Sequence, residues 1–415
     1  MRQVGPTIGG RYLHWDDLRR RKAPDELNHE AWWYLIKGAR ERYRREVPLK
    51  TEFGRPFYFS NLDEILEAEH RADGVLLGNV GVLPGLLDTQ HRDRYLQRSL
   101  VEEAISSSQI EGATTTRHVA KDMILKGRAP RDRHERMIVN NYRAMEAISD
   151  LVDRPLTVEL LCDLHRTVTE GTLDDERDAG RLRTTDDIVV GDALEVDVVY
   201  HRPPPAVSLP ERLDRLCHFA NGASETGFLH PMVRAIVLHF MIGYEHPFVD
   251  GNGRTARALF YWSIRRSGYW LFEFLSISTL IKNAKSRYER AFLLTETDEF
   301  DLTYFILHQI DVIRRATGDL DAYLKRKEEE RKDADRLLAR RDDLNHRQRD
   351  LVVHALRHPG TIYTIAEHKR KHRVVYQTAR TDLLDLVERG FLESWRTGKA
   401  LQFRAPVELP KRLRP

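Results

Sequence analysis

One short segment, residues 246–257, holds most of the side chains in this chain that could do chemistry. It contains a histidine, an aspartate, two glycines and two arginines within twelve positions. Helical patterns flank the segment, so we expect a loop that runs into the N-terminus of a helix. Gly251 and Gly253 allow backbone conformations that other residues avoid, and they let a ligand approach the chain closely. Backbone N–H groups at such a helix start, with the helix dipole behind them, form a site for an anion.

The charged side chains of this segment suit a polyphosphate ligand. Arg254 and Arg257 lie three positions apart and therefore share one face of the following helix. Two guanidinium groups beside a backbone anion site match the geometry of phosphate groups. Asp250 offers a hard oxygen ligand for Mg²⁺ held between phosphates, and His246 can act as a general base near neutral pH.

Each part of the segment also has a purely structural interpretation. The tripeptide Gly251-Asn252-Gly253 is often no more than a capping turn, and a histidine before a proline is usually structural. The glycine spacing approaches a dinucleotide-binding fingerprint, but a helix rather than a strand precedes it, which excludes that motif. The sequence contains no P-loop motif. The combination of base, acid, glycines and arginines in one place favours the catalytic interpretation.

The segment matches the signature of the Fic family, H-x-F-x-[DE]-G-N-G-R-x-x-R, at every specified position. The resemblance covers roughly residues 95–305. It implies a mainly α-helical fold, with a Fic helical core and a β-hairpin flap. It also implies an enzyme that transfers AMP from ATP to a Ser, Thr or Tyr hydroxyl of a protein, with pyrophosphate as the leaving group. Such chemistry depends on positioning, a metal ion and charge stabilisation.

The resemblance assigns a role to each matching residue of the segment. His246 would take the proton of the attacking hydroxyl, and Asp250 would hold Mg²⁺ against the α- and β-phosphates. The region of Gly251, Asn252 and Gly253 would cradle the α-phosphate. Arg254 would bind the β-phosphate side and Arg257 the γ-phosphate.

A second motif, residues 107–112, lies upstream. Gly112 is a typical C-terminal helix stop, but Glu111 in a last turn opposes the helix dipole and calls for another partner. Ser107, Glu111 and Gly112 match the inhibitory motif of Fic proteins, [ST]-x-x-x-E-[GN]. The resemblance implies that Glu111 pairs bidentately with Arg257 and holds ATP in an unproductive pose. In some members of the family the same glutamate helps to hydrolyse AMP from the target.

Two further regions complete the resemblance. Residues 187–200 are rich in β-formers around a Gly191-Asp192 turn and predict a hairpin, which the proline run at 203–205 ends. This hairpin would be the flap, which holds the target protein as an added strand. Tyr288 and residues 298–303 lie where Fic proteins close over the adenine, although core packing or a surface turn is the simpler interpretation of these residues.

Helices must position most of these groups. Apolar residues recur at three- and four-residue spacing in several segments, which predicts helices over 28–45, 95–108, 135–151, 157–170, 209–220, 231–244 and 252–267. Residues 320–346 are almost entirely charged residues and leucine, and predict a solvated connecting helix with ion pairs between successive turns.

The last part of the chain predicts a winged helix. Helices are expected over 347–357, 362–371 and 374–390, followed by a hairpin over 391–403 around Thr397-Gly398. Residues 351–415 hold 13 Lys and Arg against 6 Asp and Glu, so this part carries a net charge of +7. A protein-interaction module and a DNA-binding module both fit; phosphate contacts would come from Lys369, Arg370, Lys371, Arg373 and Arg380.

Composition limits the class of protein. The 415 residues suffice for two or three domains, and 41% hydrophobic with 32% charged residues indicates a globular chain. A net charge of +3 argues against a uniformly cationic nucleic-acid binder. Two cysteines, Cys162 and Cys217, exclude a disulfide framework. The sequence shows neither a secretory signal nor an apolar run of about 18 residues, so we expect a cytoplasmic protein without membrane contact.

The sequence therefore predicts four parts: an N-terminal Fic-associated region (1–95), a Fic domain with its inhibitory helix (96–310), a charged linker helix (311–346) and a winged-helix domain (347–415). The predicted function is a protein adenylyltransferase that uses ATP and Mg²⁺ and is autoinhibited by Glu111. The alternatives are a DNA-binding regulator whose Fic core senses a nucleotide, and a Fic enzyme that uses another nucleotide or removes AMP. Proteins of this family often dimerise, so a homodimer is one expected assembly.

Overall fold

Two units make up the chain, Met1–Leu320 and Asp321–Pro415. The computed structural model describes residues 4–24, 27–77, 89–191, 199–222, 227–339, 343–358, 360–397 and 400–413. Among these residues we find no helical stretch with the length and apolar character that crossing a bilayer requires.

Two consecutive helices, α9 (Pro231–Glu245) and α10 (Asn252–Arg266), pack against each other at the centre of the first unit. The side chain of His230 accepts a hydrogen bond from the N–H of Met232 and so caps α9, while Pro231 occupies the first turn, where its missing N–H is tolerated. Both helices are buried on nearly every face, as the central helices of a domain must be. The sequence predicted both helices to within one residue at each end.

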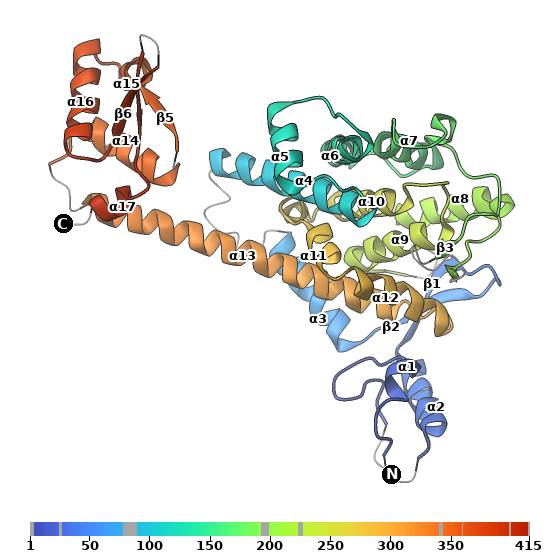
Figure 1. The fold of residues 1–415 in the computed structure, drawn as a ribbon. Helices are drawn as coiled ribbons and strands as arrows, with labels where there is room; N and C mark the ends of the chain where they lie inside the picture. Colours follow the sequence, from blue (N-terminus) through green and yellow to red (C-terminus); the bar gives the residue numbers. More distant parts are fainter. Residues whose placement is uncertain are drawn as a thin grey trace. The chain divides into compact units, whose positions relative to one another are not determined.

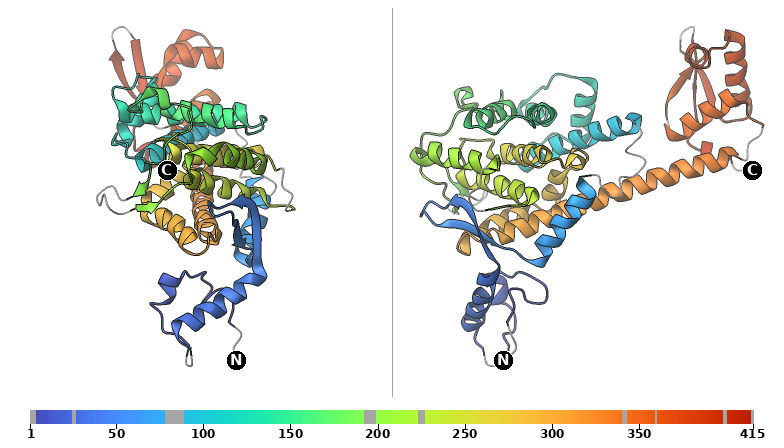
Figure 2. Two further views of the ribbon diagram at one scale, coloured as in Figure 1. Left: turned by 90° about the vertical axis from the view of Figure 1, so that its right-hand side faces the viewer. Right: turned by 180° about the vertical axis from the view of Figure 1, so that it is seen from behind.

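Other helices surround this pair (Figures 1 and 2). Three of them pack against α10: α4 (Thr89–Ile110), α6 (Arg133–Leu151) and α7 (Val158–Thr169). The helix α8 (Leu209–Ala220) packs against α9, and α5 (Arg117–Lys126) and α11 (Ile277–Asn283) pack against α4. The helix α12 (Lys285–Thr297) follows α11. The helices expected at 135–151, 157–170 and 209–220 are confirmed, and α4 begins before the expected residue 95.

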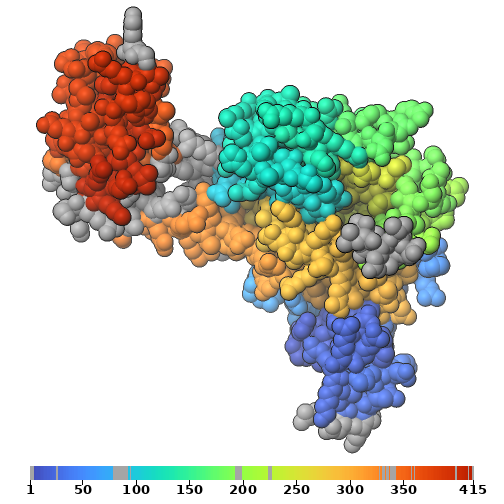
Figure 3. Space-filling model, in the orientation of Figure 1, coloured from blue at the N-terminus to red at the C-terminus, as the bar shows by residue number. Residues whose placement is uncertain are grey.

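The N-terminal part of this unit pairs a strand hairpin with short helices. Its elements are α1 (Trp15–Leu18), α2 (His29–Arg40), β1 (Arg44–Lys50), β2 (Pro56–Ser60) and α3 (Asp63–Arg71). The predicted helix over 28–45 is too long, because the chain turns into β1 at Arg44 and pairs there with Ser60. The helix α2 and its neighbours stand out at one end of the first unit in the space-filling view (Figure 3).

Short elements complete the first unit. The predicted hairpin is confirmed as an antiparallel pair, β3 (Val190–Gly191) and β4 (Val199–His201), in which Val190 lies opposite His201. Gly191, expected in the turn, is a strand residue, and Asp192 lies outside the described residues. Single turns of other helix types occur at η1 (Glu41–Tyr43), η2 (Ala72–Leu76), η4 (Glu176–Asp178), η5 (Ala206–Ser208) and η6 (Trp270–Phe274).

A single long helix, α13 (Thr303–Ala339), begins in the first unit and continues into the second. It contains the charged segment that the sequence predicted to be helical, with ion pairs one turn apart such as Lys325–Asp321 and Lys332–Glu328. The helix therefore starts before the expected linker boundary at residue 311.

The second unit then combines helices with a three-stranded antiparallel sheet of order β5-β7-β6. The elements are α14 (His346–Arg357), β5 (Ile362–Thr364), α15 (Ile365–His372), α16 (Tyr376–Glu388), β6 (Glu393–Thr397), β7 (Ala400–Arg404) and α17 (Leu409–Arg412). The prediction of a helix from residue 362 is wrong at its start, since Ile362–Thr364 pairs with β7. Thr364 ends that strand and caps α15 through a capping box with Glu367.

Candidate active site

The loop between α9 and α10 has a fixed shape. His246 follows the last turn of α9 with φ 44°, a left-handed conformation that is uncommon outside glycine, and Gly251 begins α10 with φ 83°. The amide of Asn252 donates to the Phe248 carbonyl over 2.8 Å and accepts from the Phe248 N–H over 3.0 Å. The Asn252 side chain therefore shapes the loop by bonding to its backbone, and the phosphate cradle expected from the region of Gly251, Asn252 and Gly253 stays a prediction.

The helix α7 supports this loop from behind. The Nε2–H of His165 donates to the Asp250 carbonyl over 2.8 Å, while its Nδ1 accepts from the Gly180 N–H over 3.0 Å. The ring also stacks on Phe248, with centroids 3.7 Å apart and an angle of 4° between the planes. Sequence analysis did not identify His165, because an isolated histidine on a helix carries no motif.

We expect acid to weaken the fold through His165. Burial lowers the pKa of this histidine to about 4. Protonation would also remove the acceptor that the Gly180 N–H uses. The unfolded chain, with an ordinary histidine pKa, binds more protons between about pH 6.5 and pH 4, so the free energy of unfolding should fall there by on the order of 2–3 kcal/mol. Urea unfolding at several pH values should show a shallower dependence in His165→Gln. The same dependence as wild type would contradict this, and the exposed His218→Gln is the control.

Gly251 is required by both its conformation and its surroundings. A Cβ atom at this position would lie 2.5 Å from Cγ2 of Thr169. We expect Gly251→Ala to lower the free energy of unfolding by about 2–4 kcal/mol in denaturant titrations. Gly54 has a similar φ of 78° but open space around it, so Gly54→Ala should lose only about 1 kcal/mol. Equal losses in the two variants would show that the contact with Thr169 does not matter.

His246 is held as a neutral base. Its Nδ1 lies 3.3 Å from the Gly243 carbonyl, which can only accept, so Nδ1 carries the proton and Nε2 is left as the proton acceptor. Burial lowers the pKa of His246 to about 4. The ring is therefore unprotonated at neutral pH, as a general base must be.

Asp250 and Arg254 lie next to each other at the start of α10. One oxygen of Asp250 accepts from the Gly251 N–H over 2.6 Å, and the other lies 3.7 Å from both Arg254 and Arg133. The Arg254 guanidinium is 1% exposed and donates to the Val168 carbonyl over 2.7 Å, yet its buried Nε has no hydrogen-bond partner in the described part of the chain. Such an unmatched cationic donor fits an anionic ligand.

Arg257 is buried and faces the second motif. Its Nε donates to the Ser107 hydroxyl over 2.8 Å, and its Nη2 donates to the Ser107 carbonyl and to Oε1 of Glu111, each over 2.9 Å. The bidentate pair expected from the sequence does not form, because Ser107 occupies the Nε side of the guanidinium. The buried Nη1 has no hydrogen-bond partner within the described residues.

The Glu111 carboxylate lies over the first turn of α10. A Cβ built on Gly253 would come within 2.2 Å of Oε1 of Glu111, so only glycine leaves room for the carboxylate here. Burial alone would raise the pKa of Glu111, but the charges of Arg257 and Arg254 outweigh it and lower the pKa. A negative group at this place also interacts favourably with the N-terminus of α10.

The end of α4 fixes the position of Glu111. Gly112, with φ 90°, closes the helix: its N–H donates to Gln109 and the next N–H, that of Ala113, donates to Ser108. Farther up α4, the buried carboxylate of Glu103 accepts hydrogen bonds from Ser276 and Ser278 beside α11. The stop predicted from Gly112 is thus confirmed, and it presents Glu111 to α10.

The residues expected near an adenine, Tyr288 and 298–303, lie in two different surroundings. The Tyr288 hydroxyl lies 2.8 Å from Nε2 of the buried His239, and the ring packs among Phe292 and Phe305. Asp298 forms an ion pair with Lys37 over 2.9 Å, and Asp301 accepts from the Tyr12 hydroxyl over 2.5 Å. Tyr288 therefore packs in the core, where the charges of Arg257 and Glu111 act on its hydroxyl, while residues 298–303 connect to the N-terminal region.

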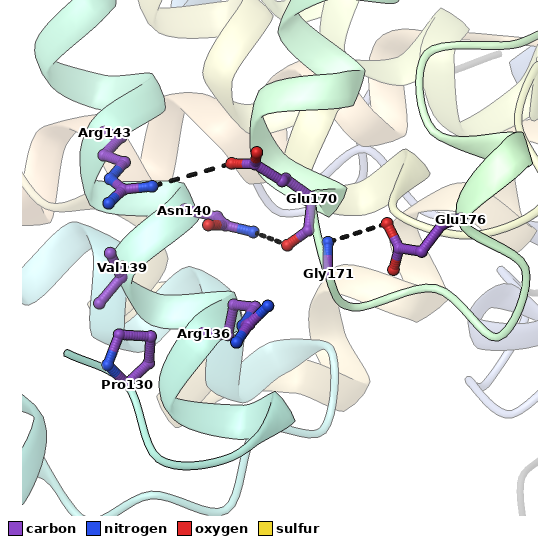
Figure 4. Close-up of a pocket in the computed structure, with 8 residues that line it drawn as sticks. All are labelled: Pro130, Arg136, Val139, Asn140, Arg143, Glu170, Gly171 and Glu176. Carbon is purple, nitrogen blue, oxygen red and sulfur yellow. Dashed lines mark hydrogen bonds and ion pairs between the residues drawn. The ribbon is translucent and has the colours of Figure 1, made fainter.

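A pocket of about 520 Å³ is built from residues outside both motifs (Figure 4). It lies between α6 and the turn after α7. The Asn140 amide donates to the Glu170 carbonyl over 2.6 Å, and the Gly171 N–H donates to Glu176 over 3.0 Å. None of the residues of either motif lines this pocket.

Comparisons with known proteins agree with the motif. Residues 155–264 match the Fic/DOC family, a range that includes the loop but not Glu111. The protein adenylyltransferase Fic of Nematostella vectensis is 26% identical over 239 residues, which cover 56% of this chain and 49% of that protein. The protein of the same name from Drosophila grimshawi is 28% identical over 180 residues, or 43% and 34% of the two chains. The chain thus spans half or less of the length of these curated relatives.

The fold is also shared with a solved structure. A Fic family protein from Desulfovibrio desulfuricans G20 superposes with a TM-score of 0.58 at 20% identity, and covers 83% of this chain and 97% of its own. The mainly helical architecture predicted from the sequence is confirmed by this likeness.

Proposed function

We propose that this chain, which carries a Fic/DOC-family domain, is a protein adenylyltransferase that moves AMP from ATP to a hydroxyl of a protein and is held inactive by Glu111. The observation that supports this most is the carboxylate of Glu111 over the start of α10 and against Arg257. It occupies an anion site of the kind that a nucleotide phosphate needs. The names of the curated relatives support the same chemistry.

Each functional residue of the loop and of the start of α10 would have a separate role in the reaction. The target hydroxyl would attack the α-phosphorus of ATP, its proton would pass to Nε2 of His246, and the bond to the bridging oxygen of the β-phosphate would break to release pyrophosphate. The buried Nε of Arg254 and Nη1 of Arg257 would gain phosphate oxygens as acceptors. The N–H groups at the start of α10 would stabilise charge on the α-phosphate.

A magnesium ion fits the donor set if the nucleotide supplies most of its ligands. Asp250 offers a half-exposed carboxylate, and the described residues contain no group of three or more His, Cys, Asp and Glu that could enclose a metal. Mg²⁺ is commonly held by one or two carboxylates together with substrate phosphates. Bound there, it would neutralise phosphate charge, and Asp250 would be the residue that holds it.

The flap would hold the target. Val189, Val199 and Tyr200 are exposed on and beside the short strands β3 and β4. The sheet they form has two strands within the described residues, so an extended segment of the target can add to an edge. Backbone pairing of this kind tolerates many target sequences.

Label position in the nucleotide tests the proposal. Incubated with Mg²⁺ and candidate targets, the chain should transfer label to protein from α-labelled ATP and not from γ-labelled ATP. Label transfer from the γ-position would indicate a kinase-type reaction and overturn the proposal. A parallel series with labelled GTP, UTP and CTP decides the donor base. Loss of AMP from a pre-labelled target would reveal hydrolytic removal of AMP.

A second candidate function belongs to the second unit. The order of its helices and strands fits the predicted winged helix, and Lys369, Arg370, Arg373 and Arg380 are exposed without an ion-pair partner among the described residues. The first turn of α16 also lacks acidic residues. We infer that these side chains contact DNA phosphates, with Lys371 engaged by Asp350 in the free protein. A protein partner and a homodimer are the other assemblies to test.

Binding of the full chain to duplex DNA at several salt concentrations tests this second function. We expect the logarithm of the affinity to fall linearly with the logarithm of salt, and Arg380→Ala to make that slope shallower by about one. Arg314, which forms an ion pair with Asp311, provides the control variant Arg314→Ala. Affinity without salt dependence would contradict phosphate binding.

A further inference from the structure

The exit of the flap carries a buried histidine between two acceptors. His201 ends β4, and its side chain is 8% exposed. Its Nδ1 lies 2.6 Å from Oε2 of Glu296 on α12, and its Nε2 lies 2.7 Å from the Tyr244 carbonyl in the last turn of α9. Sequence analysis did not single out this residue.

The two contacts define the protonation state of the ring. A backbone carbonyl has no proton to give, and an ionised carboxylate is also only an acceptor. Both ring nitrogens of His201 must therefore donate, which requires the imidazolium form. This cation lies at the C-terminus of α9, where carbonyls lack partners within the helix and where the helix dipole favours positive charge.

The entrance of the flap is tied to the same helix end. The buried guanidinium of Arg183 donates to the His246 carbonyl over 2.9 Å, and the Arg183 N–H donates to the Pro247 carbonyl over 2.9 Å. The Arg183 guanidinium also donates to the Thr185 carbonyl and to the Pro204 carbonyl, which lies beyond the flap. Two cationic side chains, one before β3 and one at the end of β4, thus hold residues 244–247, and His246 keeps its left-handed conformation between them.

We propose that His201, as an imidazolium ion, is a positioning residue that fixes both the flap and the backbone of His246, and that loss of its proton releases this attachment. A neutral ring can donate to only one of the two acceptors, so either the flap strand separates from α12 or the end of α9 loses its cap. The consequence for activity rests on the proposed function, whereas the protonation state does not.

The charged groups around His201 determine whether its pKa is raised or lowered. Burial by itself lowers the pKa of His201, but the hydrogen bond and charge of Glu296 outweigh it, and with Glu52 of the β1–β2 connection they raise the pKa. The neighbouring Glu245 is paired with Arg212 of α8 over 2.6 Å. His246, on the same helix end, has its pKa lowered instead.

The opposite shifts define a pH window. The attachment through His201 is complete at low pH and is lost as pH rises through its raised pKa. The base function of His246 is complete above its own lowered pKa and is lost in acid. The attachment through His201 and the base function of His246 are both intact only at pH values between the two pKa values. Paired groups whose surroundings separate their pKa values behave in this way.

The ¹⁵N resonances of the ring test the protonation state directly in the full chain. With selectively labelled histidine at pH 7, His201 should show two protonated nitrogens, assigned by their loss in His201→Gln. In Glu296→Gln the pKa of His201 should fall, and a neutral tautomer should replace the imidazolium. A neutral His201 ring at pH 7 in the wild type would overturn the proposal, whatever reaction the protein catalyses.

The kinetic measurements use variants made in the Glu111→Gly protein, in which the proposed inhibition is removed. We expect His201→Gln to lower kcat about 10- to 100-fold, because His246 and the flap lose their placement, with KM for ATP changed less than about twofold. Glu296→Gln should keep kcat and abolish the loss of activity at alkaline pH, since its amide can donate to Nδ1 of a neutral ring. His218→Gln, an exposed histidine of α8, is the control. Unchanged kcat in His201→Gln would overturn the positioning role.

Discussion

Replacing Glu111 with glycine is expected to raise label incorporation from α-labelled ATP by about 10- to 100-fold. The Glu111 carboxylate accepts from Nη2 of the buried Arg257 over 2.9 Å and lies against Gly253. A hydrogen bond between charged groups contributes about 1.5–3 kcal/mol, and a phosphate must displace it to reach Arg257. Each 1.4 kcal/mol corresponds to about tenfold. Self-labelling and target labelling at fixed ATP and Mg²⁺ measure the effect.

Two matched variants test whether the effect depends on the charge of Glu111 and on its position. Glu111→Gln keeps the size of the side chain and removes its charge, so it should give part of the activation. Glu102→Gln makes the same change on the same helix, but Glu102 pairs with Arg117 at the surface and should have no effect. Equal labelling in wild type and Glu111→Gly, with ATP bound in both, would show that the carboxylate does not restrain the enzyme.

Replacing His246 with alanine in the Glu111→Gly background is expected to abolish most of the transfer, by about 10²- to 10⁴-fold. The Nε2 of His246 is the proton acceptor of the loop, and burial keeps the ring neutral by lowering its pKa to about 4. Without it, the hydroxyl must attack with its proton in place. Single-turnover labelling with α-labelled ATP measures the loss.

Nucleotide binding is the control for this variant. The phosphate contacts come from α10 and not from His246, so ATP should raise the melting temperature of both proteins by similar amounts. His218→Ala, on the exposed face of α8, should label like its parent. Retained transfer in His246→Ala would remove this histidine from the proton path. If both transfer and ATP binding are lost, the variant has damaged the loop and His246→Asn replaces it.

The proposed nucleotide site draws on two motifs that are far apart in the chain. Ser107 and Arg257 are 150 positions apart, yet two hydrogen bonds join them. Ser107 thereby orients the guanidinium, whose Nη2 donates to both Ser107 and Glu111. The serine of the second motif would contribute to the proposed restraint through Arg257 rather than through a ligand.

The amino-acid sequence by itself determined the chemical inventory of the site and the local elements that carry it. The spacing from His246 to Arg257 defined the loop, its glycines and the helix face with both arginines, and Gly112 defined where α4 ends. These features depend on residues a few positions apart, whose backbone preferences and helical periodicity operate locally.

The tertiary structure decided which groups meet. His165 supports the loop from 85 positions away, and His201 reaches Glu296 over 95 positions. The periodicity of the sequence does not predict such contacts, because packing of whole helices brings the partners together. Packing also placed Tyr288 in the core, and strand pairing turned Ile362–Thr364 into a strand beside β7. Burial lowers the pKa of both His246 and His201, but the carboxylate of Glu296 reverses the shift at His201, so the partners that packing brings together decide the direction of each shift.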